Sequence, residues 1–400
     1  MALLALGEVT YPFFAPRLTL MGLGCSKEAG AQAKALGAAH VLLVTDKVLN
    51  KLGMVQQIRF GLESAGLKVT VFDGVEPNPT DKNVHEGASI YRENQCDALV
   101  SLGGGSSHDC AKGIGVVVSH GGQIGDYVGM NLLKKPLPPL MAINTTAGTG
   151  SECTRMLIIT NTVTHAKMLI GDARCAALVA INDPKLMADM PPALTAATGM
   201  DALTHAVEAY ASTMATPLTD ACALQAIRLI GTWLRPAVAN GANMQARDKM
   251  AYAEYMAGLA FSNGRLGAVH AMAQSLGSVC DLPHGVCCAI LLPWVCESNL
   301  MAVPERYAEI AIALGENVDG LSILDAAAKT STAIRRLNKD IGMPSSLAET
   351  GSKDVDVEML AKSTMNEVAL KTNPRSVTYD QVLGMFKAAL GPNPAKAATR

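Results

Sequence analysis

The first half of the chain alternates short apolar runs with longer helix-length stretches. Six runs of four or five residues are largely apolar, namely Val41–Thr45, Val69–Phe72, Ala98–Leu102, Leu140–Asn144, Met156–Thr160 and Leu178–Asn182. Uniformly apolar runs of this length are typical of strands buried on both faces of a sheet. Helix-length segments lie between them, for example Val48–Ala65, Asp81–Asn94 and Ser107–Ser119. The pattern therefore predicts parallel strands joined by right-handed helical crossovers.

The second half has a different pattern. After Asp183 the strand pattern disappears, and Ala-rich helical periodicity begins near Ala193. It continues to Leu390 through Pro217–Leu234, Gln245–Phe261 and Leu266–Val279. Prolines between Asn182 and Pro192 forbid a continuous helix there. We therefore expect an α/β domain over residues 1–190, an all-helical domain over residues 191–390, and a disordered tail over residues 391–400.

Composition supports a folded chain and excludes several partners. Of the 400 residues, 49% are hydrophobic and 17% are charged, which places the chain well inside the globular range. Lys plus Arg number 33 against 35 Asp plus Glu, so no positive field exists to hold nucleic acid or an anionic membrane. The apolar stretch Val286–Cys296 is too short to span a bilayer.

The chain ends and the cysteines indicate the compartment. The N-terminal segment MALLALGEVTYPFF has neither the basic start nor the cleavage site of a signal peptide. The ten cysteines are spaced irregularly with no C-x-x-C pair, which argues against a disulfide framework. We expect a cytoplasmic protein with reduced cysteines.

Two glycine- and hydroxyl-rich loops follow predicted strands. Gly103–Ser107 comes directly after a strand and opens a helix, so its backbone amides and the positive helix end suit a nucleotide pyrophosphate. Without a G-x-G-x-x-G pattern, an ordinary glycine turn is the alternative. Asn144–Glu152 likewise follows a strand and suits a second wall of a phosphate and nicotinamide-ribose site, with a plain polar loop as the alternative.

Asp46 also follows a strand. An acidic side chain there can accept hydrogen bonds from a ribose 2′-hydroxyl and repel a 2′-phosphate, which favours NAD over NADP. The alternative is a helix N-cap.

Three histidines and one aspartate mark the helical half. Asp201 and His205 lie four residues apart and so share one helix face. His270 opens a helical stretch, and His284 lies in the turn DLPHG. One carboxylate and three imidazoles suit a divalent ion such as Fe²⁺ or Zn²⁺, although hydrogen-bonded core histidines are an alternative. Cys280 is a possible substitute thiolate ligand.

Five motifs together resemble the iron-containing, group III alcohol dehydrogenases. They are Gly103–Ser106, Pro77–Thr80, TTAGTGSE at Thr145–Glu152, ATGMDALTHAVEAY at Ala197–Tyr210 and LPHGVC at Leu282–Cys287. The resemblance runs from Phe13 to about Leu390 and is closest to the branch of NAD-dependent methanol and 1,3-propanediol dehydrogenases. It implies a Rossmann-like nucleotide-binding domain, a helical metal-binding domain and a catalytic cleft between them.

The resemblance also implies a set of site residues. The metal ligands would be Asp201, His205, His270 and His284, with Fe²⁺ as the expected ion and Zn²⁺ or Mn²⁺ as alternatives. Cofactor contacts would come from Asp46, Asn78, Gly104, Gly105, Ser106, Asp109, Thr145, Thr146, Thr149, Ser151 and Lys167. A homo-oligomer, a dimer or larger, is also expected.

Three positions depart from the family pattern. Gln274 stands where the family usually has a histidine beside the nicotinamide, and Gln cannot titrate. Arg265 and Lys371 stand where the family generally carries small uncharged residues. Arg265 follows Phe261 by four residues, at a position that the family directs toward the substrate. Solvated surface charges are the alternative for both.

We expect an NAD-linked, metal-dependent alcohol dehydrogenase or aldehyde reductase for short primary alcohols such as methanol, ethanol, propanol and 1,3-propanediol. The first alternative is a reductase of a small anionic aldehyde, such as sulfoacetaldehyde or a semialdehyde, which would use the charge of Arg265. Further alternatives are a lyase of the dehydroquinate synthase type and a nucleotide-binding protein that has lost activity.

Overall fold

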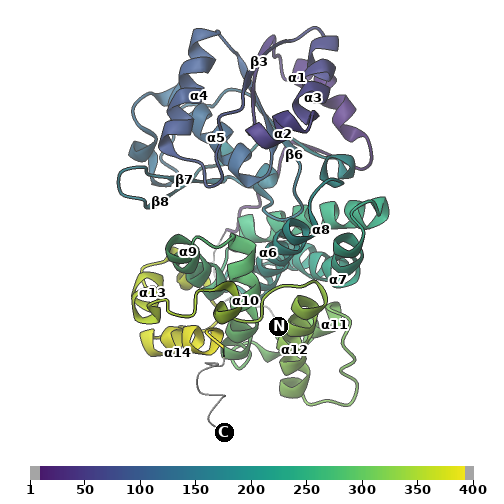
Figure 1. Cartoon of the computed structure of the whole chain (residues 1–400), viewed down its shortest axis with the longest axis vertical. Coiled ribbons are helices and arrows are strands. Elements are labelled where there is room, and N and C mark those ends of the chain that lie inside the picture. Colours follow the sequence, from purple (N-terminus) through teal and green to yellow (C-terminus); the bar gives the residue numbers. More distant parts are fainter. Residues whose placement is uncertain (1–9, 392–400) are drawn as a thin grey trace. The chain divides into compact units, whose positions relative to one another are not determined.

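The computed structural model describes residues 10–391, which form two compact units (Figure 1). One unit contains residues 14–188, and the other contains residues 189–391 together with residues 10–13. The tail predicted for residues 391–400 lies, apart from its first residue, outside the described residues, as does most of the segment MALLALGEVTYPFF.

The first unit is built on a six-stranded parallel sheet. Its strands are β1 (Leu18–Met21), β2 (His40–Val44), β3 (Lys68–Phe72), β4 (Ala98–Gly103), β6 (Leu140–Asn144) and β9 (Val179–Asn182). They lie in the order β1-β9-β6-β4-β2-β3, and every neighbouring pair is parallel. The parallel sheet expected from the uniformly apolar runs is confirmed. β1 was not expected from the sequence.

A second, smaller sheet corrects one prediction. β5 (Gly129–Met130), β8 (Lys167–Gly171) and β7 (Met156–Thr160) form a three-stranded sheet in that order. β7 pairs with β8 in antiparallel fashion and takes no part in the parallel sheet, so the expectation of a parallel strand at 156–160 is wrong. Its residues alternate between buried and half-buried. The one-sided burial was hidden because the half-buried Met156 and Ile158 are also apolar.

Helices cover both faces of the parallel sheet. They are α1 (Ala29–Ala35), α2 (Lys47–Lys51), α3 (Met54–Ser64), α4 (Asp81–Glu93) and α5 (Gly105–His120). Alternate strand residues enter different cores: Val41 and Leu43 pack with α1 and α3, whereas Leu42 and Val44 pack on the side of α4 and α5. The single helix predicted over Val48–Ala65 is divided at Gly53, whose φ of 82° no regular helix accepts.

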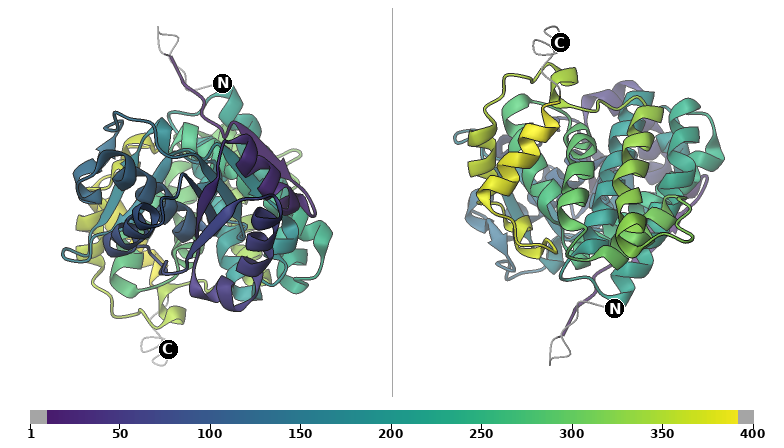
Figure 2. Two further views of the ribbon diagram at one scale, coloured as in Figure 1. Left: turned by 90° about the horizontal axis from the view of Figure 1, so that it is seen from above. Right: turned by 90° about the horizontal axis from the view of Figure 1, so that it is seen from below.

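The regular secondary structure of the second unit consists of helices alone within the described residues. Its helices are α6 (Pro192–Ala211), α7 (Pro217–Ala239), α8 (Met244–Gly264), α9 (Ala268–Cys280), α10 (His284–Asn299), α11 (Pro304–Ala313), α12 (Ile323–Asp340), α13 (Val357–Thr364) and α14 (Tyr379–Ala389). Figure 2, right, shows these helices from below. Residues 189–391 contain no strand, which confirms the helical second half. Short 3-10 helices occur at Cys25–Glu28, Ile124–Tyr127, Ser151–Cys153, Ala173–Cys175, Pro184–Met187, Leu347–Thr350 and Val368–Thr372.

Helix α6 is the central element of this unit. It packs against α7, α8 and α10, and nearly all of its residues from Thr195 onward are buried. Such complete burial requires apolar or small residues on every side, and α6 is accordingly rich in alanine. Its few polar side chains are therefore exceptional, and they define the site described next.

Within residues 10–391, no helix has both the length and the apolar character needed to cross a membrane. All ten cysteines are free thiols.

Candidate active site

Three acidic or basic side chains lie on one face of α6. Asp201, His205 and Glu208 follow one another at spacings of four and three residues, so they stand in a row along the helix. All three are at least nine-tenths buried. A charged row inside a helical core is costly unless each member has a partner.

Two further histidines come from α9 and α10. His270 lies in the first turn of α9, and His284 is the first residue of α10. The His270 ring stacks on that of His205, with 4.6 Å between ring centroids, and the His284 ring lies 5.3 Å from His270. The tertiary structure thus brings together the four residues expected as metal ligands.

The three imidazoles converge on one oxygen. His205 Nε2 lies 3.7 Å from Asp201 Oδ1, and the Nε2 atoms of His270 and His284 each lie 3.6 Å from it. These separations exceed the usual N–H···O hydrogen bond of about 2.7–3.2 Å. They approach the spacing of two donor atoms that share one ion. The buried His270 Nε2 makes no hydrogen bond to any described residue. The residues therefore fit a divalent metal.

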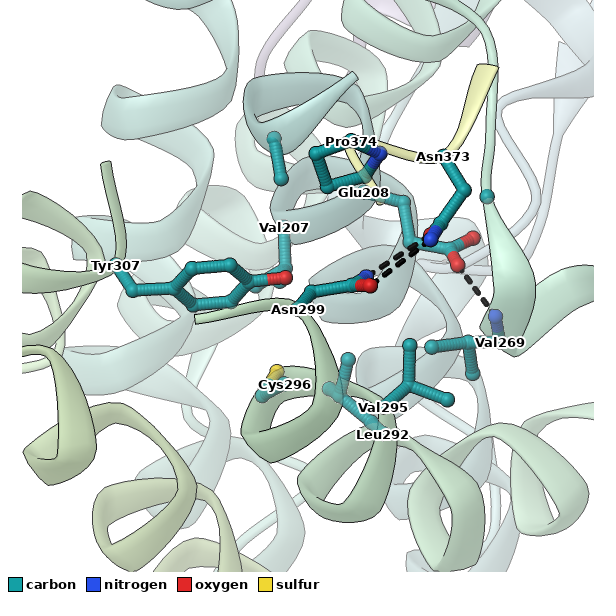
Figure 3. Close-up of a pocket in the computed structure, with 12 residues that line it drawn as sticks. Val207, Glu208, Val269, Leu292, Val295, Cys296, Asn299, Tyr307, Asn373 and Pro374 are labelled. Carbon is teal, nitrogen blue, oxygen red and sulfur yellow. Dashed lines mark hydrogen bonds between the residues drawn. The ribbon is translucent and has the colours of Figure 1, made fainter. Parts of the chain in front are cut away.

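Glu208 orients His270 from behind. Its carboxylate lies 2.6 Å from His270 Nδ1 and accepts a hydrogen bond from the Val269 amide (Figure 3). A carboxylate on the far nitrogen of a ligating histidine fixes the ring and its tautomer, leaving Nε2 to face the metal. Sequence reasoning missed Glu208, although its place one turn after His205 on a buried helix was a usable signal.

A pair of asparagines extends this support. Asn373 and Asn299 exchange hydrogen bonds through their side-chain amides, as Figure 3 shows. Asn373 Oδ1 also accepts a hydrogen bond from the Ala268 amide at the start of α9. These contacts hold the first turn of α9, which carries His270.

The electrostatics of the site favour a cation. Burial alone would raise the pKa of Asp201, but the neighbouring His205, His270 and His284 together hold it well below its usual range. Burial alone would lower the pKa of His270, but the Asp201 and Glu208 carboxylates raise it to about 9. The buried carboxylates thus attract positive charge to this point, as protons or as a metal ion.

The cysteine in the site is not the one suggested by the sequence. Cys288 Sγ lies 3.6 Å from His284 Nε2 and 3.8 Å from Asp201 Oδ1. Among the described residues, Asp201, His270, His284 and Cys288 form the group of ligand atoms that all lie within 4.8 Å of one another. His205 is outside this group, and it is placed at the site by the 3.7 Å between its Nε2 and Asp201 Oδ1. Cys280, the substitute ligand considered from sequence, is outside this group because it ends α9 before the turn at Asp281.

The expected substrate residues lie near the same helices. The Phe261 ring stacks on His205 with 4.1 Å between centroids. Arg265 follows the last residue of α8, has a positive φ of 71° and is half-buried. Gln274 stands one turn after His270 on α9 and is also half-buried. Lys371 is exposed, which agrees with a solvated surface charge.

In the first unit, the two loops that follow β4 and β6 lie against each other. The Thr145 amide donates to the Gly103 carbonyl at 3.0 Å. A Cβ on Gly104 would lie 2.8 Å from Thr146 Oγ1, and one on Gly105 would lie 3.1 Å from the Thr149 side chain. The expected Gly104, Gly105, Ser106, Thr145, Thr146 and Thr149 are therefore adjacent at the carboxyl edge of the sheet, where parallel sheets bind ligands.

Asp109 and Ser151 are hydrogen-bonded to each other within the first unit. Ser151 Oγ donates to Asp109 Oδ1 at 2.6 Å, and the Ile158 amide donates to Asp109 Oδ2 at 2.9 Å. The buried Lys112 ammonium bonds Ser151 as well. This network joins α5 to the loop after β6. Direct contact of Asp109 or Ser151 with a cofactor stays a prediction.

Asp46 has the N-cap role considered from the sequence. Its Oδ1 accepts hydrogen bonds from the amides of Val48 and Leu49 at the start of α2. Capping uses one carboxylate oxygen and leaves a negative charge beside the end of β2, so it is compatible with the predicted ribose contact. Asn78 and Lys167, both expected cofactor residues, meet through a 2.9 Å hydrogen bond.

Comparison with known proteins covers both units. The family model described as iron-containing alcohol dehydrogenase matches residues 16–184. The model described as the C-terminal part of the Fe-containing alcohol dehydrogenase family matches residues 195–390.

Individual relatives match over nearly their whole length. The chain is 48% identical to an NAD-dependent methanol dehydrogenase of Bacillus methanolicus, over 94% of this chain and 99% of the relative. It is 49% identical to a 1,3-propanediol dehydrogenase of Klebsiella pneumoniae, over 95% of this chain and 98% of the relative. A crystal structure of a 1,3-propanediol oxidoreductase superposes with a TM-score of 0.94 at 49% identity, covering 95% of this chain and all of the other.

Proposed function

The chain belongs to the iron-containing alcohol dehydrogenase family, and from that premise we propose that it interconverts short primary alcohols and aldehydes with NAD and a divalent metal. The observation that carries the metal part is the convergence of three histidine nitrogens on Asp201 Oδ1. Methanol, ethanol, propanol and 1,3-propanediol are the proposed substrates, in line with the names of the relatives.

The residues of the site have distinct proposed roles. Asp201, His205, His270 and His284 would hold the ion, and Glu208 keeps the His270 ring oriented through Nδ1. Phe261 covers the His205 ring. When bound, the metal supplies Lewis-acid chemistry and the nicotinamide supplies redox chemistry. Gln274 can donate and accept hydrogen bonds but cannot relay a proton, so it is proposed only to position its neighbours.

The experiment removes one ligand. His270→Ala is expected to lose bound metal and turnover while it keeps its fold and its NAD affinity, because NAD is proposed to bind in the other unit. His165→Asn, at an exposed position, is the matched control and is expected to keep both metal and activity. Metal analysis, alcohol-dependent NADH formation and NAD titration are the measurements. Full activity of a metal-free His270→Ala protein would refute the metal-dependent mechanism.

We also propose the native ion, the cellular compartment and the oligomeric state. The family match supports Fe²⁺, with Zn²⁺ and Mn²⁺ as alternatives. Ten free thiols are typical of a reducing compartment, which supports the cytoplasm. A homo-oligomer, a dimer or larger, is proposed and can be tested by sedimentation of the purified protein.

A specific observation favours a second substrate class. The Arg265 guanidinium is half-buried, and burial lowers the pKa of Arg265. No ion pair joins it to a carboxylate among residues 10–391. A partly desolvated guanidinium of this kind suits a small aldehyde that carries a sulfonate or carboxylate, such as sulfoacetaldehyde or a semialdehyde.

Paired substrates decide between the two classes. Arg265→Gln is expected to lower kcat/KM for an anionic aldehyde by roughly ten- to a hundredfold and to leave a neutral aldehyde of equal length unchanged. Arg265→Lys, which keeps the charge, is the control. If Arg265→Gln changes kcat/KM equally for both substrates, or for neither, Arg265 is only a surface charge. Short neutral alcohols then remain the proposed substrates.

A further inference from the structure

Cys288 is the cysteine that lies with candidate metal ligands in the described part of the chain. It lies four residues after His284 on α10, hence on the same helix face, and its side chain is fully buried. Its Sγ is 3.6 Å from His284 Nε2 and 3.8 Å from Asp201 Oδ1. The neighbouring Cys287 is equally buried but turns its sulfur elsewhere, toward the position of Gly277 on α9.

The spacing at Cys288 is that of a ligand shell. Metal–nitrogen and metal–oxygen bonds of about 2.0–2.2 Å and a metal–sulfur bond of about 2.3 Å would place neighbouring donor atoms of one ion roughly 2.9–3.7 Å apart. The Sγ separations from His284 and Asp201 fall close to this range, like those of the three histidines from Asp201. As hydrogen bonds, the same two contacts are weak, because a thiol is a poor donor.

We propose that Cys288 is a thiolate ligand of the divalent ion, in addition to the aspartate and histidines. This inference rests on the metal site of the proposed function. As the sulfur–metal bond forms, the S–H bond breaks and its proton leaves to solvent, with no change of oxidation state.

A thiolate changes which metals the site prefers. Sulfur is a soft donor that suits Zn²⁺ and Fe²⁺, whereas Mn²⁺ prefers oxygen ligands. Cys288 therefore biases the otherwise mixed nitrogen and oxygen set toward Zn²⁺ and Fe²⁺. Loss of Cys288 is expected to lower the ratio of Zn²⁺ to Mn²⁺ affinity by at least about tenfold. Mutation of residues that only support the ligands already lowers metal affinity by about ten- to a hundredfold.

Cobalt substitution tests the sulfur directly. Anaerobic protein loaded with Co²⁺ should show visible d–d bands that report a bound ion, and a near-ultraviolet band for charge transfer from thiolate to cobalt. Cys288→Ser should lose the charge-transfer band and keep the d–d bands. Cys287→Ser is the matched control, an equally buried neighbour whose change should keep both.

The outcomes separate this inference from the proposed function. Failure of the wild type to bind Co²⁺ or Zn²⁺ would overturn the metal site itself. Bound Co²⁺ without a charge-transfer band, or a band that survives Cys288→Ser, would overturn the thiolate ligand alone. Should Cys288→Ser fail to fold, X-ray absorption of the Zn²⁺-loaded wild type decides: a sulfur neighbour at about 2.3 Å supports the ligand, and a shell of only nitrogen and oxygen overturns it.

Discussion

Single side chains in this protein are held in protonation states that their surroundings dictate. His108, on α5, is fully buried, and its Nδ1 lies 2.8 Å from Ser101 Oγ. Burial, helped by the nearby Lys112 charge, lowers the pKa of His108 from 6.5 to about 3. The folded protein therefore keeps this imidazole neutral across the physiological range.

His108 should make stability fall in mild acid. Below pH 6.5 the unfolded state binds a proton at His108 that the folded state refuses until about pH 3. Between pH 6.5 and about pH 3, the contribution of His108 to the free energy of unfolding therefore decreases by about 1.4 kcal/mol for each pH unit of acidification. His108→Gln removes the titration and should show a shallower loss of stability between pH 6 and pH 4. Urea unfolding of both proteins at several pH values measures this, and equal slopes would contradict it.

Asp46 is the single residue that we expect to set the preference for NAD over NADP. Asp46→Asn keeps the helix cap, because Asn caps as well as Asp, but it removes the charge. We expect the ratio of NADP to NAD in kcat/KM to rise by at least about tenfold, since two unit charges 4 Å apart are worth about 1 kcal/mol in water and more near a protein surface. A native preference for NADP, or an unchanged ratio in the variant, would show that Asp46 is only a cap.

At the scale of elements, the site depends on how closely α10 approaches α6. Gly285 follows His284 at the start of α10, and a Cβ there would lie 2.0 Å from the Ala197 carbonyl oxygen on α6. No real contact is this short, and the atom it meets belongs to the backbone. The glycine therefore sets the distance between the helix that carries His284 and the helix that carries Asp201.

Gly285→Ala should separate these two helices. We expect a loss of roughly 1–3 kcal/mol in the free energy of unfolding, together with weaker metal binding, because His284 moves away from Asp201. Gly384→Ala on α14 is the control: a Cβ meets nothing within 4 Å there, so the change should be neutral or stabilising by roughly 0.5–1 kcal/mol. Thermal unfolding and zinc titration of both variants are the measurements. Unaltered metal affinity in Gly285→Ala would mean that α10 adjusts without moving His284.

At the scale of the molecule, the candidate metal ligands all belong to one of the two units. Asp201, His205, His270 and His284 lie within residues 189–391, and so do both tryptophans, Trp233 and Trp294. An ion that binds only the folded state stabilises it, by about 2.7 kcal/mol when the free ion is at a hundred times its dissociation constant. The stabilisation therefore belongs to the helical unit, where tryptophan fluorescence can report it.

Metal removal should consequently act on one unit. Chelation is expected to lower the unfolding midpoint seen by tryptophan fluorescence by several degrees, and re-addition of Zn²⁺ or Fe²⁺ should restore it. The same treatment of His270→Ala should have little effect, because that variant has already lost the ion. A midpoint that does not move after metal analysis shows complete removal would count against a structural contribution of the metal.

The sequence by itself determined what depends on near neighbours in the chain. Uniformly apolar runs predicted the parallel sheet, and helical periodicity predicted the second unit, because both patterns repeat within a few residues. The four-residue spacing placed Asp201 and His205 on one face for the same reason. The glycines at the end of β4 were recognisable because Gly103, Gly104 and Gly105 follow one another directly after an apolar run.

Only the tertiary structure decided what depends on residues far apart. Strand β7 pairs with β8 in a separate sheet, which an apolar run cannot reveal because it does not specify its partner. Glu208 contacts His270 from another helix. Cys288, and not Cys280, lies beside the ligands because the turn at Asp281 ends α9 after Cys280. The convergence on Asp201 Oδ1 joins three helices. Such convergence is a property of helix packing, which fixes distances between side chains that no spacing along the chain encodes.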